Sequence, residues 1–260
     1  MTYPGGKAMA KHVLEVLNDP VFDNMDYIEP FVGLGNILYR VENKKSYTAS
    51  DNAENVIDLL SDLQKYKRFP HIDAKLYRQL KDDQPLNKVE KQGFPLKTLE
   101  AFASIATFNG IYWKSSGFAD KSSSRDYKKT RANYYTKLLA SPSFEACTFK
   151  HCNYLDYQPK DCLIYCDAPY QHSQALNHRF YNMTKPFDHH LFWQVMREWS
   201  KTNIVFVSES SAPDDFEIIA TKARKATQAG NKKNSHEYDD NLYTWNGGQY
   251  KLQQQDINLF

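Results

Sequence analysis

The sequence has little cysteine, no long apolar run and almost no net charge. Its four cysteines, Cys147, Cys152, Cys162 and Cys166, fall short of a disulfide framework and suit a reducing compartment. No stretch approaches the roughly 18 consecutive apolar residues of a membrane helix. The first residues also lack the apolar core of a signal peptide. These absences predict a soluble, cytoplasmic protein with no membrane partner.

Two histidines near the cysteines raise the question of a zinc site. His151 and His172 are close in sequence to the cysteine cluster. Cys162 and Cys166, however, fall on a predicted strand, where they either face opposite sides or both pack inward. We therefore predict no bound metal.

The net charge of +2 does not by itself predict a polyanionic partner, but the basic residues are unevenly distributed. One basic stretch runs from Lys114 to Lys137, against only two acids. A second holds Lys222, Arg224, Lys225, Lys232 and Lys233, with no acid between Glu217 and Glu237. Such clusters are expected where phosphates bind, and equally on a solvated helix face, so both interpretations stay open.

The order of predicted elements indicates an α/β protein with an insertion. Apolar periodicity predicts helices at 7–17, 36–41, 53–66 and 187–201, and strands at 27–28, 47–49, 163–166 and 203–210. The alternation of strands and helices stops between 65 and 142, where helical patterns occur at 71–80 and 96–107. We predict one sheet built from 1–64 and 143–260, interrupted by the insertion 65–142. The end of the chain, from "NLYTW" onward, predicts an edge hairpin with Gly247-Gly248 as its turn.

The stretch "YIEPFVGLGNIL" has the pattern F-x-G-x-G after a strand and before a predicted helix. Glycines let the backbone approach a ligand closely, and a helix start offers free amides. Asp51 ends the next strand, where an acid in nucleotide-binding folds accepts hydrogen bonds from ribose hydroxyls. The departure from G-x-G-x-x-G, with Glu29-Pro30 in front, points to an adenosine-bearing cofactor other than a dinucleotide.

A second candidate site is "DCLIYCDAPY", in which a core strand ends in Asp167. The carboxyl ends of such strands are where ligands bind in α/β proteins. Acid-proline pairs are also ordinary turn chemistry, so this motif is weak when taken alone.

Seven short motifs share their order with a known enzyme family. They are "YPGGKAMA", "YIEPFVGLGN", "SDNAENVIDL", "TFNGIYW", "CNYLDY", "IYCDAPY" and "NIVFVSES". In this order they resemble the Dam-type, alpha class adenine-specific DNA N6-methyltransferases over nearly the whole chain. The resemblance implies a Rossmann-like, S-adenosylmethionine-dependent methyltransferase sheet of seven strands with an inserted, mainly helical target recognition domain. The catalytic domain would then comprise 1–64 and 143–260, and the target recognition domain 65–142.

The resemblance also implies roles for individual residues. S-adenosylmethionine would be bound by Tyr3, Lys7, Phe31, Gly33, Gly35, Asp51, Asn52, Tyr154, Leu155 and Asp167, with plain core packing as the alternative for Tyr154 and Leu155. The catalytic tetrad would be Asp167, Ala168, Pro169 and Tyr170. The family usually has D-P-P-Y; alanine at 168 keeps the backbone carbonyl and loses only the ring that fixes φ. Because Pro169 still favours extended backbone at 168, we expect activity to survive.

Double-stranded DNA is the implied partner, and no obligatory protein partner is predicted. The candidate DNA-binding residues are Asn109, Gly110, Tyr112, Lys114, Arg125, Lys128, Lys129 and Arg131. The family's usual arginine after Tyr112 is missing, so the target sequence is left open. Members of the family occur alone or beside a restriction enzyme, and many are encoded by phages.

The function predicted from these motifs is transfer of a methyl group to N6 of a flipped adenine in duplex DNA. One alternative is methylation of cytosine N4 or of RNA adenine, since the same chemistry acts on any conjugated exocyclic amine. Another, prompted by Ala168, is a catalytically weak protein that binds cofactor and DNA.

Overall fold

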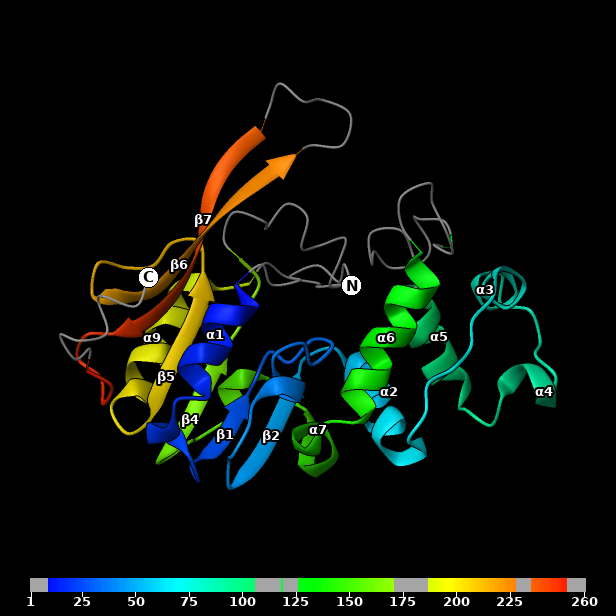
Figure 1. The fold of residues 1–260 in the computed structure, drawn as a ribbon, viewed down its shortest axis with the longest axis horizontal. Helices are drawn as coiled ribbons and strands as arrows, with labels where there is room; N and C mark the ends of the chain where they lie inside the picture. Colours follow the sequence, from blue (N-terminus) through cyan, green and yellow to red (C-terminus); the bar gives the residue numbers. More distant parts are fainter. Residues whose placement is uncertain (1–8, 106–117, 119–125, 171–186, 228–234, 252–260) are drawn as a thin grey trace.

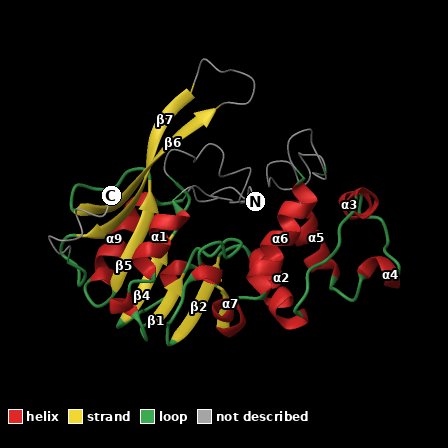
Figure 2. Ribbon diagram, in the orientation of Figure 1, coloured by secondary structure: helices red, strands yellow, loops and turns green. Residues whose placement is uncertain are grey.

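A seven-stranded mixed sheet forms the centre of the molecule (Figures 1 and 2). The computed structural model describes residues 9–105, 118, 126–170, 187–227 and 235–251. The strand order is β3-β2-β1-β4-β5-β7-β6, in which the first five are parallel and β7 is antiparallel to both of its neighbours. The strands are β1 Asp26–Glu29, β2 Ser46–Asp51, β3 Cys147–His151, β4 Cys162–Cys166, β5 Ile204–Glu209, β6 Phe216–Thr227 and β7 Ser235–Trp245. The predicted α/β architecture is confirmed.

The central strand β4 explains why the sheet needs helices on both faces. All five of its residues are buried, as expected for a parallel strand covered on both sides. Leu163 and Tyr165 belong to the same buried cluster as residues of α1 Ala10–Leu17 and α2 Glu54–Tyr66, whereas Ile164 belongs to the cluster that contains residues of α9 His189–Ser200.

The cysteines of β4 pack into the core as free thiols. Cys162 and Cys166 lie on the same face as Ile164 and both are buried, which settles the alternative left open by the sequence. In the part of the chain that the structure describes, no group of three or more His, Cys, Asp or Glu side chains is arranged to hold a metal ion. None of the described helices is both long and apolar enough to cross a membrane.

The described part of the chain between β2 and β3 is mainly helical and lies on the β3 and β2 side of the sheet, opposite β6 and β7 (Figure 1). It contains α3 Ala74–Lys81, α4 Lys88–Lys91, α5 Leu96–Ile105, α6 Tyr127–Leu139 and α7 Pro142–Ala146. Its core is continuous with that of the sheet: Leu99 and Phe102 of α5 belong to the same buried cluster as Leu60 of α2. Phe102 also contacts Tyr135 of α6, with ring centroids 4.8 Å apart.

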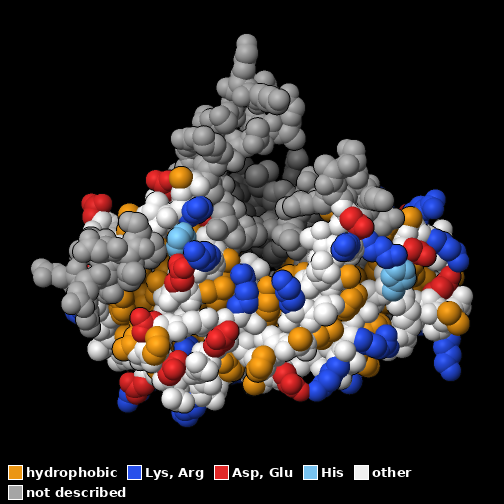
Figure 3. All heavy atoms as spheres, in the orientation of Figure 1, with side chains coloured by type: hydrophobic (Ala, Val, Ile, Leu, Met, Phe, Trp, Pro, Cys, Tyr) orange, Lys and Arg blue, Asp and Glu red, His pale blue; other side chains and the backbone are white. Residues whose placement is uncertain are grey.

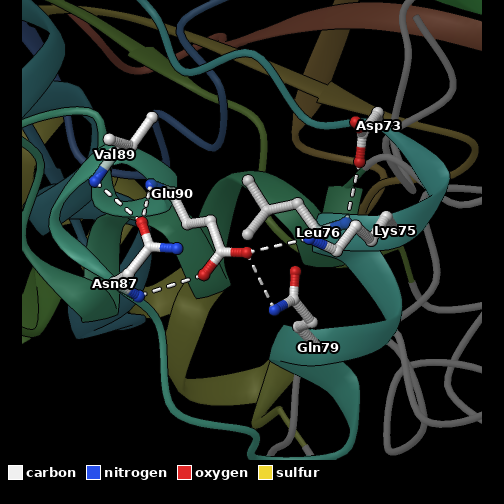
Figure 4. A network of polar contacts seen from close by, with 7 residues as sticks. All are labelled: Asp73, Lys75, Leu76, Gln79, Asn87, Val89 and Glu90. Carbon is white, nitrogen blue, oxygen red and sulfur yellow. Dashed lines mark hydrogen bonds and ion pairs between the residues drawn. The ribbon is translucent and has the colours of Figure 1, made fainter.

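A capping box joins the two short helices α3 and α4 (Figure 4). The Asn87 side chain accepts hydrogen bonds from the first amides of α4, and Glu90 accepts one from the Asn87 amide at 3.0 Å. The other carboxylate oxygen of Glu90 contacts Lys75 and Gln79 of α3, each at 3.1 Å. These hydrogen bonds lower the pKa of Glu90 to about 2, and the bond from the Asn87 amide has the largest effect. Side-chain hydrogen bonds therefore hold α3 and α4 together, since these two short helices are too small to form a packed core of their own.

The predicted helix at 36–41 is wrong. Only a short 3-10 helix, Leu38–Arg40, forms there. Gly33 and Gly35 have φ of +50° and +76°, so the backbone turns through left-handed conformations just before it. Since no α-helix begins at this loop, the expected contribution of a helix N-terminus to ligand binding is withdrawn.

The predicted C-terminal hairpin is also wrong. The strand that contains "NLYTW" is β7, and it pairs with the preceding strand β6 rather than with the chain that follows. Gly247-Gly248 turns the chain after β7, where the Gly248 amide donates to the Trp245 carbonyl at 3.0 Å. Both strands were missed because "KARKAT" and "SHEYDD" are rich in polar and charged residues and lack the alternation of apolar and polar residues that predicts a half-buried strand.

Candidate active site at the carboxyl edge of the sheet

The loops with the predicted site motifs meet at one edge of the sheet. Parallel register pairs Glu29 with Ala49, Ile28 with Ile164 and Asp51 with His151. The carboxyl ends of β1, β2, β3 and β4 therefore lie side by side (Figure 1). This is the edge at which parallel α/β sheets bind ligands.

The glycine loop after β1 is held by hydrogen bonds from two directions. The Gly33 amide donates to Asp51 Oδ2 at 3.0 Å, and the Val32 amide donates to the Ser50 carbonyl at 2.9 Å. From the other side, the Tyr134 hydroxyl of α6 donates to the Leu34 carbonyl at 2.5 Å. The loop is thus fixed before any ligand binds.

Asp51 is a desolvated carboxylate that already accepts backbone hydrogen bonds. Its Oδ1 accepts from the Ala53 amide at 2.9 Å, while Oδ2 accepts from Gly33. Burial raises the pKa of Asp51, and the amides of Ala53, Gly33 and Asn52 oppose that rise. Each carboxylate oxygen has a second lone pair that can accept a ribose hydroxyl. The donor set and the glycine loop therefore fit an adenosine-bearing cofactor.

The aromatic residues expected beside the cofactor form a cluster over α9. Phe31 and Tyr154 have ring centroids 5.2 Å apart, and both rings pack on Phe187 and Phe192. Tyr154 is 8% exposed, and burial raises its pKa to about 12. Core packing, the alternative for Tyr154, is what the structure shows; Leu155 is 46% exposed and is accessible to a ligand.

The tetrad follows β4 directly. Asp167 and Tyr170 are half-buried, and Ala168 is 4% exposed. The Tyr170 hydroxyl donates to Asp240 Oδ1 of β7 at 2.5 Å. Burial first, then the nearby carboxylates of Asp167 and Asp240, raise the pKa of Tyr170 well above its usual value. Tyr170 is therefore a neutral phenol whose hydroxyl is anchored to another strand.

Three polar residues of this site were missed by the sequence analysis. Glu29, 2% exposed at the end of β1, accepts a hydrogen bond from the Tyr27 hydroxyl at 2.8 Å. The sequence could have indicated this contact, because Tyr27 and Glu29 are two residues apart in a strand and therefore share a face. Tyr134 and Asp240 had no local signal, because their partners are 100 and 70 residues away in sequence.

The candidate DNA-binding residues divide into three groups. Lys128 and Lys129 are exposed in the first turn of α6, which begins at the N-cap Asp126. Arg131 is 7% exposed, with its guanidinium 5.5 Å from the centroid of the Phe118 ring. Its expected phosphate contact is therefore not supported, since Arg131 shares the buried face of α6 with Tyr135 and Leu138. Outside the described residues lie Asn109, Gly110, Tyr112, Lys114 and Arg125, and also the predicted cofactor residues Tyr3 and Lys7.

The surface charges on the face shown in Figure 3 are mixed. Lysine and arginine side chains alternate there with aspartate and glutamate, without a large area of one sign.

Neighbouring tyrosines of α6 allow a matched test of the glycine loop. We expect Tyr134→Phe to lower the free energy of unfolding by about 1 kcal/mol and to raise the Kd for S-adenosylmethionine a few-fold, because the Leu34 carbonyl loses its donor. Tyr135→Phe is the control, since the buried Tyr135 hydroxyl has no hydrogen-bond partner among the described residues. Calorimetric titration and thermal unfolding measure both effects. Equal changes in the two variants would refute a role for Tyr134 in holding the loop.

Comparisons with known proteins identify the family. The sequence profile of the D12 class N6 adenine-specific DNA methyltransferases matches residues 3–240. No curated protein matches the chain. Among solved structures, an rRNA methyltransferase, aviRa from Streptomyces viridochromogenes, is 11% identical with a TM-score of 0.40, covering 94% of this chain and 88% of that one. A candidate RNA methyltransferase from Pyrococcus horikoshii is 7% identical with a TM-score of 0.41, covering 91% and 82%.

We draw no conclusion from structural similarities of that size. The family profile covers most of the chain, and its match includes the glycine loop, Asp51 and the tetrad. The chain belongs to the D12 class N6 adenine-specific DNA methyltransferase family, whose enzymes use S-adenosylmethionine as the methyl donor.

Proposed function

We propose that the tetrad Asp167 to Tyr170 holds the amino group of a flipped adenine and that the adjacent glycine loop and Asp51 hold the cofactor. The observation that carries this proposal is the shared edge: Asp167 follows β4, which pairs with β1, and Asp51 ends β2 on the other side of β1. S-adenosylmethionine, when bound there, supplies an electrophilic methyl group.

The adenine must leave the duplex, because its amino group cannot be reached inside the base stack. Asp167 accepts a hydrogen bond from that amino group, and the backbone carbonyl of Ala168 accepts a second. Two acceptors in fixed directions draw the nitrogen lone pair out of conjugation with the ring and aim it for direct displacement. The bond from nitrogen to the methyl carbon would form as the bond from that carbon to the sulfonium sulfur breaks, the neutral thioether would leave, and the extra amino proton would be lost to solvent. Tyr170 stacks on the extruded base. Catalysis is then mainly positioning, and no covalent enzyme intermediate is needed.

Asp51 is the central cofactor-binding residue in this proposal. Its carboxylate accepts the ribose hydroxyls, next to Asn52, while Gly33 and Gly35 let the backbone approach the methionine moiety. Phe31, a member of the aromatic cluster over α9, lies beside the methionine moiety, and Leu155 contacts the cofactor adenine. Tyr3 and Lys7 complete the site. Methyl transfer to unmethylated duplex DNA, with Asp167→Asn as the inactive control, tests the proposal as a whole.

We further propose that 65–142 is the target recognition domain, inserted between the two parts of the catalytic domain at 1–64 and 143–260. Two observations support this proposal. The described part of this segment is mainly helical, and α6 exposes Lys128 and Lys129 in its first turn while its Tyr134 contacts the glycine loop. DNA bound at this end of α6 would lie near the site of methyl transfer.

Removing both lysines tests this placement. We expect Lys128→Ala/Lys129→Ala to weaken duplex binding and to reduce the dependence of log K on log salt by about 2, because each lysine releases roughly one counterion per phosphate neutralised. Lys137→Ala is the control, since Lys137 is exposed in the last turn of the same helix. Binding is measured by fluorescence anisotropy between low and moderate salt. An unchanged slope in the double variant would exclude this end of α6 as a phosphate contact.

A further inference from the structure

Asp240 is a buried carboxylate that contacts the tetrad. It is 0% exposed, and its Oδ1 accepts the Tyr170 hydroxyl at 2.5 Å. Removing a carboxylate from water is costly unless hydrogen bonds or charges compensate it. Tyr170, which donates this hydrogen bond to Asp240, is the last residue of the tetrad.

Asp240 lies at the point in β7 where pairing with β5 ends. β7 pairs with β5 as far as the couple Asn241 and Glu209, and Asp240 is the next residue toward the hairpin. There β7 pairs only with β6, through Asp240 and Lys222. Asp240 thus sits where the β6–β7 ribbon leaves the sheet, at the same edge as the carboxyl end of β5 (Figure 1).

We propose that Asp240 is a positioning residue that fixes the ring of Tyr170 for stacking on the target base. The inference rests on the proposed role of the tetrad, and it adds a residue of β7 to a site otherwise built from the first four strands. Two side-chain torsions, χ1 and χ2, set the orientation of a tyrosine ring. A hydrogen bond at its far end, to an acceptor held in a strand, restricts both. Burial keeps the Tyr170 hydroxyl protonated, so it remains a donor at any physiological pH.

A double-mutant cycle distinguishes positioning through Tyr170 from a separate structural role of Asp240. The variants are Tyr170→Phe, which keeps the ring and removes the hydroxyl, Asp240→Asn, which keeps the shape and removes the charge, Asp240→Ala, and the doubles. Asp239→Asn is the matched control, because Asp239 is the preceding residue of β7 and is exposed. The measured quantities are kcat in methyl transfer to duplex DNA, the Kd for S-adenosylmethionine and the thermal unfolding of each variant.

We expect Tyr170→Phe and Asp240→Ala each to lower kcat by about tenfold with the cofactor Kd unchanged, which is less than the roughly 10²-fold that a 1 Å misplacement of a reacting group costs, because the ring itself remains in place. Asp240→Asn should fall between these and the parent, since a charge-assisted hydrogen bond is about twice as strong as a neutral one. In the Tyr170→Phe background, Asp240→Ala should have no further effect on kcat, because residues that act as one unit are not additive. Asp239→Asn should match the parent.

Two outcomes overturn the inference while leaving the proposed function in place. One is a full kcat in both Asp240 variants; the other is a loss at Asp240 that persists unchanged in the Tyr170→Phe background. A different result, full activity in Asp167→Asn and Tyr170→Ala, overturns the proposed role of the tetrad and the inference with it. Thermal unfolding of each variant separates lost stability from lost turnover. Asp240→Asn, which keeps the shape of the side chain, still tests the inference if Asp240→Ala fails to fold.

Discussion

Asp167→Asn is expected to lower kcat for methyl transfer by about 10²-fold or more, since misplacement of a reacting group by about 1 Å can cost about 10²-fold. Asp167 follows the buried strand β4 and is half-buried beside Tyr170. Asparagine keeps the shape, but it replaces one acceptor oxygen with a donor and removes the charge. The amino group of the target base then loses the partner that orients its lone pair.

The control for this variant is at the other end of the same strand. Asp161 is exposed just before β4 with φ of +56°, a conformation that asparagine tolerates. Asp161→Asn should therefore retain the parent kcat. The Kd for S-adenosylmethionine should change far less than kcat in Asp167→Asn. Turnover near the parent level in Asp167→Asn would remove Asp167 from the mechanism.

Asp51→Asn is expected to raise the Kd for S-adenosylmethionine by about 10- to 100-fold, because hydrogen bonds to charged groups contribute about 1.5–3 kcal/mol and each 1.4 kcal/mol is tenfold in affinity. Asp51 also accepts the Gly33 amide, so the variant loosens the glycine loop. The defect should appear in KM, with kcat largely restored at saturating cofactor. Glu54→Gln, in the exposed first turn of α2, is the control.

The same residue predicts a pH dependence of binding. Burial raises the pKa of Asp51 above its ordinary value of 3.8. Its ionised form has the acceptors that ribose hydroxyls need, so affinity should be full above the raised pKa and fall as pH decreases through it. The asparagine variant should lack this step. Titration calorimetry across acidic pH checks both curves, and an identical pH dependence in parent and Asp51→Asn would rule out this role.

Much of the parallel part of the sheet could be predicted from the sequence. β4 and β5 are short apolar runs followed by polar residues, and β1 and β2 contain the segments 27–28 and 47–49, each between polar residues. Their order along the chain placed Asp51 and Asp167 at one edge. Parallel register then joins the loops without any further information. β6 and β7 were missed as a hairpin because the half of the pair next to the turn is rich in polar and charged residues, with Lys222 opposite Asp240.

Long-range contacts were the part of the site that the sequence could not provide. Arg131 lies in a basic stretch, yet the register of α6 turns it toward Phe118 and the core. Tyr134 reaches the glycine loop and Asp240 reaches Tyr170 only after the chain has folded. A periodicity of 3.6 or 2 residues assigns a face to a residue, but it does not name the partner on that face.

The central claim is that this chain transfers a methyl group from S-adenosylmethionine to adenine N6 in duplex DNA. The most direct measurement is incubation of the protein with labelled S-adenosylmethionine and unmethylated genomic duplex, followed by nucleoside analysis, with Asp167→Asn in parallel. We predict labelled N6-methyldeoxyadenosine with the parent and none above background with the variant, which would also show that Ala168 supports turnover. Cofactor binding without any modified base, or label in N4-methylcytosine alone, would contradict the claim.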